Sequence, residues 1–507
     1  MIVQMNSMGL YGITPYTVSI ETDITRGVSC FDLVGLPDVA VRESRERVRS
    51  AIGNCGFEFP QRRIIVNMAP ADIRKSGSHY DLPILLSILI ATGALEKCPP
   101  DTAFIGELSL GGEVRPIDGI LPMAIQAKEN GIKQFFVPAD NAAEGATVEG
   151  ISILPVKHVL DLVRHLRGQK PILPVPHTLP TKEELVYPVD MGDVKGQDYA
   201  KRALEIAACG GHNLLMIGSP GAGKSMLAKR LPTILPDMTF DEMIETTKIY
   251  SVAGMLEKGR SLLTHRPFRS PHHTVSSAGL TGGGSNPRPG EISLAHHGIL
   301  FLDELPEFNR NTMEILRQPL EDGYVTISRA SSTLTYPCSI TLVAAMNPCP
   351  CGYFGHPTRP CTCSKPTVAK YLSKISGPLL DRLDLHVEVP PVDYHALSST
   401  QPEESSETIK QRVDAVRRIQ QERFKDSGIS DNAHITSAAI AQFCPMDDAA
   451  QTTLKNAFDR LGLSARGYSR LLKVARTIAD MEQSEVIRRS HIFEAIQYRT
   501  LDRKYWS

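Results

Sequence analysis

The sequence lacks an excess of charge of either sign, a hydrophobic run of membrane length and a leader-like N-terminus. Its 55 basic and 56 acidic residues nearly cancel, so any site for nucleic acid must be a local patch. The longest apolar run, Leu82–Leu95, is shorter than a membrane span. The N-terminus has no basic segment followed by an apolar core. We therefore expect a cytoplasmic protein with no membrane partner.

A glycine-rich stretch, GSPGAGKS at 218–225, fits the phosphate-loop pattern G-x-x-x-x-G-K-[ST] and follows the apolar run Leu214–Ile217. Its glycines let successive backbone N–H groups point at phosphate, and the helix that follows offers its positive end to the same anion. The predicted nucleotide-binding residues of this loop are Gly218, Ser219, Pro220, Gly221, Ala222, Gly223, Lys224 and Ser225.

A second stretch, GILFLDE at 298–304, reads as an apolar strand that ends in two carboxylates. Lys224 is expected to reach the outer phosphates, while Ser225 and Asp303 bind Mg²⁺. Glu304 is placed to orient or deprotonate the attacking water. Together the two stretches predict hydrolysis of ATP with Mg²⁺, and they leave open what the energy is used for.

The order of segments predicts an α/β protein with several domains. Strand-like and helix-like segments alternate over 1–167, and a proline-rich linker follows at 168–191. The nucleotide motifs occupy 192–390 in strand, loop, helix order. From 391 to 507 the pattern is helical, with Ser464 and Ser490 as expected helix N-caps.

Four of the ten cysteines lie close together at 349–363, as Cys349, Cys351, Cys361 and Cys363. Two C-x-C pairs joined by a short loop can supply four thiolates to a tetrahedral Zn²⁺, which predicts a closed structural site. His356 could replace one ligand. The alternative is a set of surface thiols that the cytosol keeps reduced.

The motif order in 192–390 resembles the AAA+ ATPases. The strand LVAAMNP at 342–348 ends in Asn347, where that family has its polar sensor 1 residue. The segment SGPLLDRLDLHVEV at 376–389 puts Arg382 at the place of the arginine finger, which reaches the nucleotide of a neighbouring subunit and so implies a ring. Arg466 resembles the sensor 2 arginine, with Arg470 as the second choice. The alternative for Arg382 is a surface ion pair.

Longer strings narrow the resemblance to the magnesium-chelatase-like ComM (YifB) family. They are RPFRSPHHTVSSAGLTGGG at 266–284, PGEISLAHHGILFLDELPEF at 289–308 and LLKVARTIAD at 471–480. The resemblance covers essentially the whole chain. It implies a P-loop AAA+ core with a helical lid, and a homo-hexameric helicase that drives branch migration of DNA during natural transformation. The DNA partner would be single-stranded or branched.

The N-terminal region resembles the proteolytic domain of Lon, best over 104–141 and 70–88. Lon uses a serine and a lysine, and the register places these roles at Asp81 and Leu121. Neither residue can perform them. The resemblance therefore implies a Lon-protease-like α/β domain that is a non-proteolytic scaffold.

Two segments are candidates for contact with DNA. The stretch 258–273 carries Arg266 and Arg269, which suit contacts with backbone phosphates, or alternatively line the ATP site or a subunit interface. The stretch 324–337 reads as a hairpin with Arg329 near its tip. Related helicases direct such a hairpin into the ring pore; the alternative is a structural hairpin with Arg329 at a subunit interface.

Three other functions compete with the DNA motor. A chelatase-type ATPase motor would act on a partner protein, and the N-terminal Lon-like domain argues against it. A Lon-like ATP-dependent protease is opposed by the residues at 81 and 121. A nucleotide-gated binding module would need a broken hydrolytic site, whereas Glu304 and Arg382 are both present.

Overall fold

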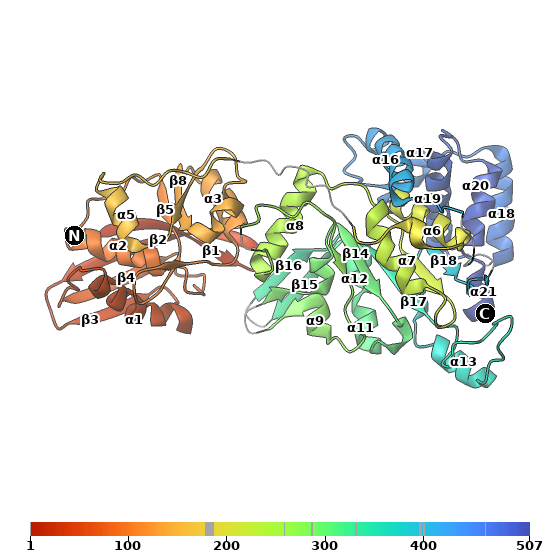
Figure 1. Cartoon of the computed structure of the whole chain (residues 1–507), viewed down its shortest axis with the longest axis horizontal. Helices are drawn as coiled ribbons and strands as arrows, with labels where there is room; N and C mark the ends of the chain where they lie inside the picture. Colours follow the sequence, from red (N-terminus) through yellow and green to blue (C-terminus); the bar gives the residue numbers. More distant parts are fainter. Residues whose placement is uncertain are drawn as a thin grey trace. The chain divides into compact units, whose positions relative to one another are not determined.

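The computed structural model describes residues 2–177, 187–257, 259–284, 287–329, 332–394, 398, 401–461 and 463–506. The chain divides into two compact units, Met1–Glu183 with Phe240–Thr264, and Glu184–Thr239 with His265–Ser507 (Figure 1). The predicted boundaries at 167, 191 and 390 stay a prediction, and part of the predicted linker, 178–186, lies outside the described residues.

The first unit is built on a seven-stranded mixed sheet in the order β3-β4-β2-β1-β5-β8-β9. Its strands are β1 (Val3–Tyr11), β2 (Thr14–Thr25), β3 (Cys30–Val34), β4 (Arg63–Ala69), β5 (Thr102–Phe104), β8 (Gln134–Pro138) and β9 (Ser152–Val156), with a small hairpin of β6 (Glu107–Leu108) and β7 (Val114–Arg115). Its helices are α1 (Val39–Asn54), α2 (Asp81–Ala91), α3 (Ile120–Glu129), α4 (Ala142–Gly145), α5 (Val159–Leu166) and α8 (Phe240–Ala253).

Helix α2 illustrates how the apolar sequence of this unit forms its buried core. All residues from Asp81 to Ile90 are buried, as expected for a helix that is apolar all round. Helix α8 comes from far along the chain, between the phosphate loop and the DE strand. Its Met243 and Ile244 pack against the same apolar cluster as Leu121 of α3. The insertion is therefore part of the first unit.

The second unit contains a five-stranded parallel sheet in the order β11-β14-β17-β10-β18. Its strands are β10 (Leu214–Ile217), β11 (Phe268–Arg269), β14 (Gly298–Leu302), β17 (Ile340–Met346) and β18 (Leu385–Glu388), and two hairpins pair β12 (Gly282–Gly283) with β13 (Arg288–Pro289) and β15 (Tyr324–Arg329) with β16 (Ser332–Pro337). The hairpin prediction for 324–337 is confirmed.

Helices cover both faces of this sheet, because its strands are apolar on both sides. In β10, Leu214 and Met216 belong to one core cluster, and Leu215 and Ile217 to the other. The helices of the unit are α6 (Asp198–Gly210), α7 (Lys224–Arg230), α9 (Ser277–Thr281), α10 (Glu291–Leu294), α11 (Arg310–Ile315), α12 (Arg317–Asp322), α13 (Lys365–Leu372), α14 (Gly377–Leu380), α16 (Ser406–Arg423), α17 (Ile440–Phe443), α18 (Asp448–Leu461), α19 (Ala465–Met481), α20 (Arg489–Gln497) and α21 (Leu501–Trp506).

The predicted fold class, α/β with a parallel nucleotide-binding sheet and C-terminal helices, is confirmed. Ser464 is the N-cap of α19 and accepts a hydrogen bond from the Gly467 N–H at 3.0 Å. The predicted cap at Ser490 is wrong. Helix α20 begins at Arg489 after Arg488, which leaves Ser490 inside its first turn.

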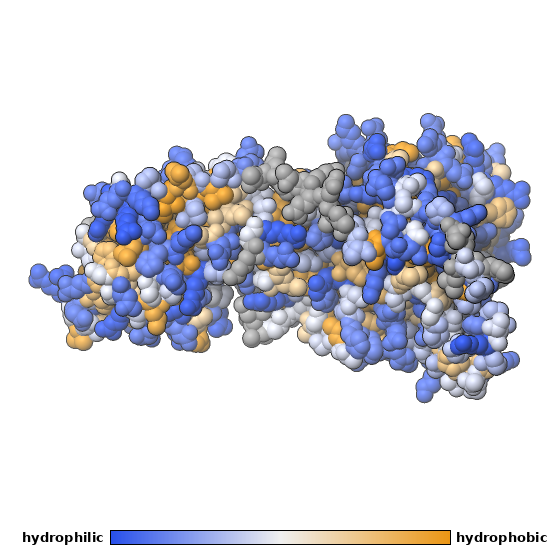
Figure 2. Space-filling view, in the orientation of Figure 1, coloured by the Kyte–Doolittle hydropathy of each residue, from blue (hydrophilic) through white to orange (hydrophobic). Residues whose placement is uncertain are grey.

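Hydrophilic and hydrophobic residues are interspersed over the face of the molecule in Figure 2. Large apolar side chains that reach solvent, such as Val28 and Leu173, are spread along the sequence, which is ordinary for a folded chain. Of the helices among the described residues, none is both long enough and apolar enough to pass through a membrane.

Candidate nucleotide site and metal cluster

The phosphate loop connects strand β10, which lies between β17 and β18 in the sheet, to helix α7. Gly221 and Gly223 have φ values of 80° and 94°, in the left-handed region that favours glycine. Gly218 has no such φ, but a Cβ there would lie 2.3 Å from the Val389 carbonyl oxygen. The loop therefore needs glycine for two different reasons: backbone conformation at two positions and space at the third.

The carboxyl ends of β10, β14 and β17 meet at one edge of the parallel sheet, where such folds bind ligands. A cavity of about 370 Å³ opens there. It is lined by Pro220, Gly221, Gly223, Lys224, Ser225, Met226, Asp303, Glu304, Met346 and Asn347. The structure thus brings together the phosphate loop, the two carboxylates and Asn347. Of these, Lys224 and Asn347 are 123 residues apart in the sequence.

Lys224 is held at the centre of this edge. Its Nζ donates to the carbonyl oxygens of Gly218 and Ser219 at 2.7 and 3.0 Å, and to Asn347 Oδ1 at 3.1 Å. Burial lowers the pKa of Lys224, and the negative charges of Asp303 and Glu304 only partly oppose this effect. A bound phosphate would add negative charge near this ammonium group and so favour its protonated form.

Ser225 and Asp303 form the oxygen pair expected of a magnesium site. The Ser225 hydroxyl donates to Asp303 Oδ2 at 2.5 Å. A hydroxyl and a carboxylate next to a phosphate pocket are hard oxygen donors, which suit Mg²⁺. The residues present therefore fit both ATP and its metal ion.

Glu304 is the second residue after the end of β14, with a left-handed φ of 52°. Its backbone N–H donates to Asp303 Oδ1 at 2.9 Å, and its carboxylate lies 3.6 Å from His273 Nδ1. The side chain is about half exposed and lines the cavity. It is therefore accessible to a water molecule.

Arg382 lies outside the lining of this cavity. Its Nε donates to the Arg317 carbonyl oxygen at 3.0 Å, its Nη1 to that of Pro378 at 2.7 Å, and its Nη2 to Glu321. Arg466 Nη2 also contacts Glu321, at 3.3 Å.

The second sensor candidate, Arg470, has a different partner. Its Nε lies 3.6 Å from Asp384 Oδ1. None of Arg382, Arg466 and Arg470 is among the described residues that line the nucleotide cavity of their own chain.

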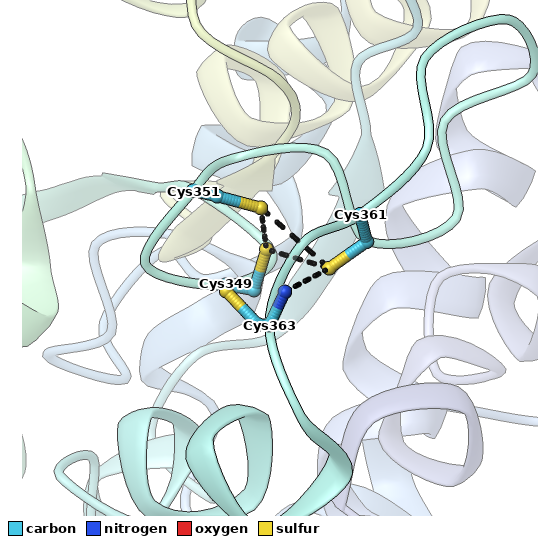
Figure 3. A group of neighbouring side chains, drawn as sticks. All are labelled: Cys349, Cys351, Cys361 and Cys363. Atoms are coloured by element: carbon cyan, nitrogen blue, oxygen red, sulfur yellow. Dashed lines mark hydrogen bonds between the residues drawn. The ribbon is translucent and has the colours of Figure 1, made fainter.

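The four cysteines at 349–363 meet in one cluster (Figure 3). Cys349 Sγ lies 3.3 Å from Cys351 Sγ and 3.7 Å from Cys361 Sγ, and the latter two are 3.6 Å apart. With Zn–S bonds of about 2.3 Å, a tetrahedral ion holds its sulfur atoms about 3.8 Å apart. The donor set and its spacing therefore fit zinc.

His356 does not take part in this cluster. Its Nδ1 accepts hydrogen bonds from the backbone N–H groups of Thr358 and Arg359, at 3.2 and 3.0 Å. The four ligand atoms that lie within reach of one ion are all sulfur. The expectation that His356 could replace a cysteine is not supported.

The basic residues predicted to touch DNA have partners within the chain. Arg266 donates to the carbonyl oxygens of Pro236, His297 and Asp237. Arg269 forms a two-point ion pair with Glu291, with both N···O distances 2.7 Å. These contacts favour a structural role for both arginines. The side chain of Arg329 lies outside the described residues.

In the first unit, the positions that correspond to the Lon dyad are buried. The carboxylate of Asp81 accepts from Arg47 Nε at 2.6 Å, from Arg47 Nη2 at 3.0 Å and from the Leu108 N–H at 3.2 Å. Leu121 is fully buried, and its backbone N–H donates to Glu144 at 2.7 Å. An ion pair and a core leucine thus occupy the two positions.

Replacing Asp81 with alanine should lower the free energy of unfolding by about 2–3 kcal/mol, measured by urea denaturation. Burial raises the pKa of Asp81 despite the bonds from Arg47, so the pair itself adds little stability. The loss arises because Arg47, whose side chain is 20% exposed, would lose its carboxylate partner. As a control, Asp161→Ala breaks an exposed pair with Arg164 and should cost under about 1 kcal/mol. Equal losses in the two variants would contradict this expectation.

Comparison with known proteins gives matches along the chain. The family model for magnesium chelatase, subunit ChlI, matches residues 190–397, and the model for its C-terminal part matches 403–499. YifB of Escherichia coli is 43% identical over 495 residues, 97% of this chain and 96% of that protein. The competence protein ComM of Haemophilus influenzae is 42% identical, with 97% and 96% covered. The chain belongs to the magnesium-chelatase-like YifB/ComM family.

Two further matches concern the N-terminal region. A model described as subunit ChlI of Mg-chelatase matches residues 20–141 of this YifB/ComM family member. The Lon protease of Metamycoplasma arthritidis is 28% identical over 169 residues, 31% of this chain and 20% of that protein. Because a chelatase description covers this region, the N-terminal domain does not by itself argue against a chelatase-type motor, contrary to the expectation above.

Sequence reasoning missed three residues that contact the predicted site residues. His273 approaches Glu304, Glu321 joins two of the candidate arginines, and Gly352 lies so close to Pro220 that a Cβ would be 2.4 Å from the proline ring. Gly352 follows Cys351 directly, which was a usable signal. Nothing in the local sequence distinguishes Glu321 from other surface acids.

Proposed function

We propose that this YifB/ComM family ATPase is a cytoplasmic, ring-forming DNA motor: a homo-hexameric branch-migration helicase that acts in recombination during natural transformation. The observation that carries the proposal is the contrast between a complete phosphate cavity and an arginine finger candidate that lies outside it. If Arg382 acts in catalysis, it acts on the nucleotide bound by another copy of the chain. In a closed ring, every nucleotide cavity has a neighbouring copy that can supply this arginine.

In this proposal the loop N–H groups and Lys224 bind the phosphates of ATP. Ser225 and Asp303 hold Mg²⁺, which supplies positive charge to the outer phosphates when bound. Glu304 accepts the proton of the attacking water, and Asn347 orients it from the end of β17. Arg466 and Arg470 remain alternatives for the sensor 2 role.

The DNA part of the proposal is supported by the family and by one structural element. A relative that matches almost the whole chain is named competence protein ComM. The β15–β16 hairpin directly precedes β17, the strand that ends beside Asn347, so a hairpin bound to DNA would be connected to the nucleotide edge. Arg329 near the hairpin tip is the remaining candidate for a phosphate contact. We no longer propose Arg266 and Arg269 for this role.

A chelatase-type motor is the second candidate, because three family models with a magnesium chelatase description match the chain. It would use the same ATP site and ring to act on a partner protein instead of DNA. Proteolysis of the Lon type is not supported by the buried residues at 81 and 121.

The deciding test is the ATPase rate with and without single-stranded, double-stranded and branched DNA. A DNA motor should be stimulated at least about five-fold by one of these, and Arg382→Ala should abolish the stimulated rate while nucleotide still binds. A rate indifferent to every DNA, in a preparation shown to form rings, would instead support the chelatase-type motor.

A further inference from the structure

Glu321, at the end of helix α12, lies between two of the arginines proposed to act in catalysis. Arg382 Nη2 donates to one of its carboxylate oxygens, and Arg466 Nη2 lies 3.3 Å from the other. The side chain of Arg382 is only 7% exposed, whereas those of Arg466 and Glu321 are 60% and 49% exposed. One carboxylate therefore bridges a buried and an exposed guanidinium.

The contacts of Arg382 turn its guanidinium toward its own chain. Besides Glu321, it binds the Arg317 carbonyl oxygen at 3.0 Å and that of Pro378 at 2.7 Å. A guanidinium binds phosphate through the same N–H groups that it presents to a carboxylate. In this position Arg382 cannot bind the phosphate of another copy unless it gives up Glu321.

A second carboxylate, Asp384, fixes the same loop in a different way. It lies 3.6 Å from Arg470 Nε and 3.5 Å from His212 Nδ1, and its Oδ2 accepts from the Asn213 N–H at 3.0 Å. Asp384 is almost fully buried, while Glu321 is half exposed. Glu321 is thus the contact that a charged group from outside can replace, and Asp384 is the anchor that stays.

The charge state of Glu321 agrees with this arrangement. Partial burial raises its pKa, but the hydrogen bond and charge of Arg382, together with the charge of Arg466, outweigh that effect and hold the pKa below its usual value. The side chain is therefore an anion at neutral pH, as a competitor of phosphate must be.

We propose that Glu321 is a positioning residue that holds Arg382 retracted, as a substitute anion, until the terminal phosphate bound by a neighbouring copy takes its place. Arg466 stays paired with Glu321 after the phosphate has displaced its carboxylate from Arg382. No charged group is then left without a partner. This inference rests on the proposed ring in which Arg382 acts on the nucleotide of a neighbour.

The same contact reaches the hairpin. Arg382 binds both ends of α12, through the Arg317 carbonyl and through Glu321. The helix ends at Asp322 with Gly323 as its C-cap, and β15 begins at Tyr324. If DNA binds the hairpin and shifts α12, the contacts of Arg382 with Arg317 and Glu321 weaken. DNA binding would then favour release of Arg382.

The test compares the ATPase of Glu321→Gln with that of the unchanged chain. Gln keeps an oxygen acceptor but loses the charge, so more subunits have Arg382 available, and the DNA-free rate should rise about five-fold. The KM for ATP should fall, and the stimulation by DNA should shrink by a similar factor. Glu321→Asp, which keeps the charge, should give a DNA-free rate below that of the Gln variant.

The matched control is Asp237→Asn, another half-exposed carboxylate with a basic partner, Lys410, in the same unit. Its rates should equal those of the unchanged chain. If Glu321→Gln melts early, Glu321→Met is the replacement of similar size. Failure of both to fold would overturn the proposal, because it would show that Glu321 is needed for the fold itself.

The outcomes separate this inference from the proposed function. If Arg382→Ala leaves the ATPase of assembled rings unchanged, the arginine finger itself is wrong. If Arg382→Ala abolishes hydrolysis but folded Glu321→Gln has an equal or lower DNA-free rate and unchanged DNA stimulation, only the role of Glu321 is overturned.

Discussion

Glu304→Gln should reduce ATP hydrolysis at least about 100-fold while leaving ATP affinity within a few-fold of the unchanged chain. The carboxylate is about half exposed and lines the nucleotide cavity, and Asp303 already occupies the place of the metal ligand beside Ser225. Removing the charge of Glu304 therefore removes the proton acceptor without removing a phosphate or magnesium contact. Single-turnover hydrolysis and binding of a fluorescent ATP analogue would measure the two effects separately.

Two further variants give this experiment its controls. Lys224→Ala should lose nucleotide binding, because Lys224 is the cation at the centre of the cavity. Glu307→Gln changes a carboxylate three residues beyond Glu304 that forms an exposed pair with Lys374 at 3.4 Å, and it should behave like the unchanged chain. A Glu304→Gln protein that hydrolyses ATP at the normal rate would show that another group accepts the proton.

The nucleotide site was predictable because its signals are local. The phosphate loop has a fixed spacing, and GILFLDE and LVAAMNP each combine an apolar strand with a polar residue at its end. Parallel strands place their carboxyl ends at one edge, so Lys224, Asp303 and Asn347 had to meet once the strands were recognised. The cysteine cluster was predictable for the same reason, since its ligands lie within 15 residues of sequence, 349–363.

The features that sequence could not give depend on partners far away in the chain. Arg269 looked available for phosphate, but its partner Glu291 lies 22 residues further on. Arg382 and Glu321 are 61 residues apart, and no local pattern links them. The position of helix α8 between two nucleotide motifs predicted that it belongs to the nucleotide domain. In the structure, its Met243 and Ile244 pack in the first unit.

The cysteine cluster and the phosphate loop are neighbours in the second unit, and this proximity gives the cluster more than a local role. Cys349 follows Asn347 by two residues, and Gly352 packs against Pro220 of the loop. A second, smaller cavity is lined by residues of both segments, among them Ser219, Gly352 and Phe354. The cysteine loop therefore packs directly against the phosphate loop.

Removing the metal from this cluster should have the second-largest effect. We expect about one Zn²⁺ per chain by elemental analysis, and loss of that ion in Cys351→Ser. Without the ion, no cation holds together the sulfur atoms of Cys349, Cys351 and Cys361, which lie 3.3 to 3.7 Å apart. The melting temperature should fall by about 5 °C or more, and ATP should bind several-fold more weakly because Gly352 no longer braces Pro220.

The control for the zinc experiment is Cys98→Ser, which changes a partly buried thiol outside the cluster and should leave zinc content and ATP affinity unchanged. Treatment of the unchanged chain with a strong chelator should reproduce the Cys351→Ser result, and added Zn²⁺ should reverse it only where all four cysteines are present. A chain purified without chelator, with reduced thiols and no zinc, would contradict the assignment. If zinc is lost but ATP affinity is unchanged, the ion stabilises only the cysteine loop. The contact between Gly352 and Pro220 then has no effect on ATP binding.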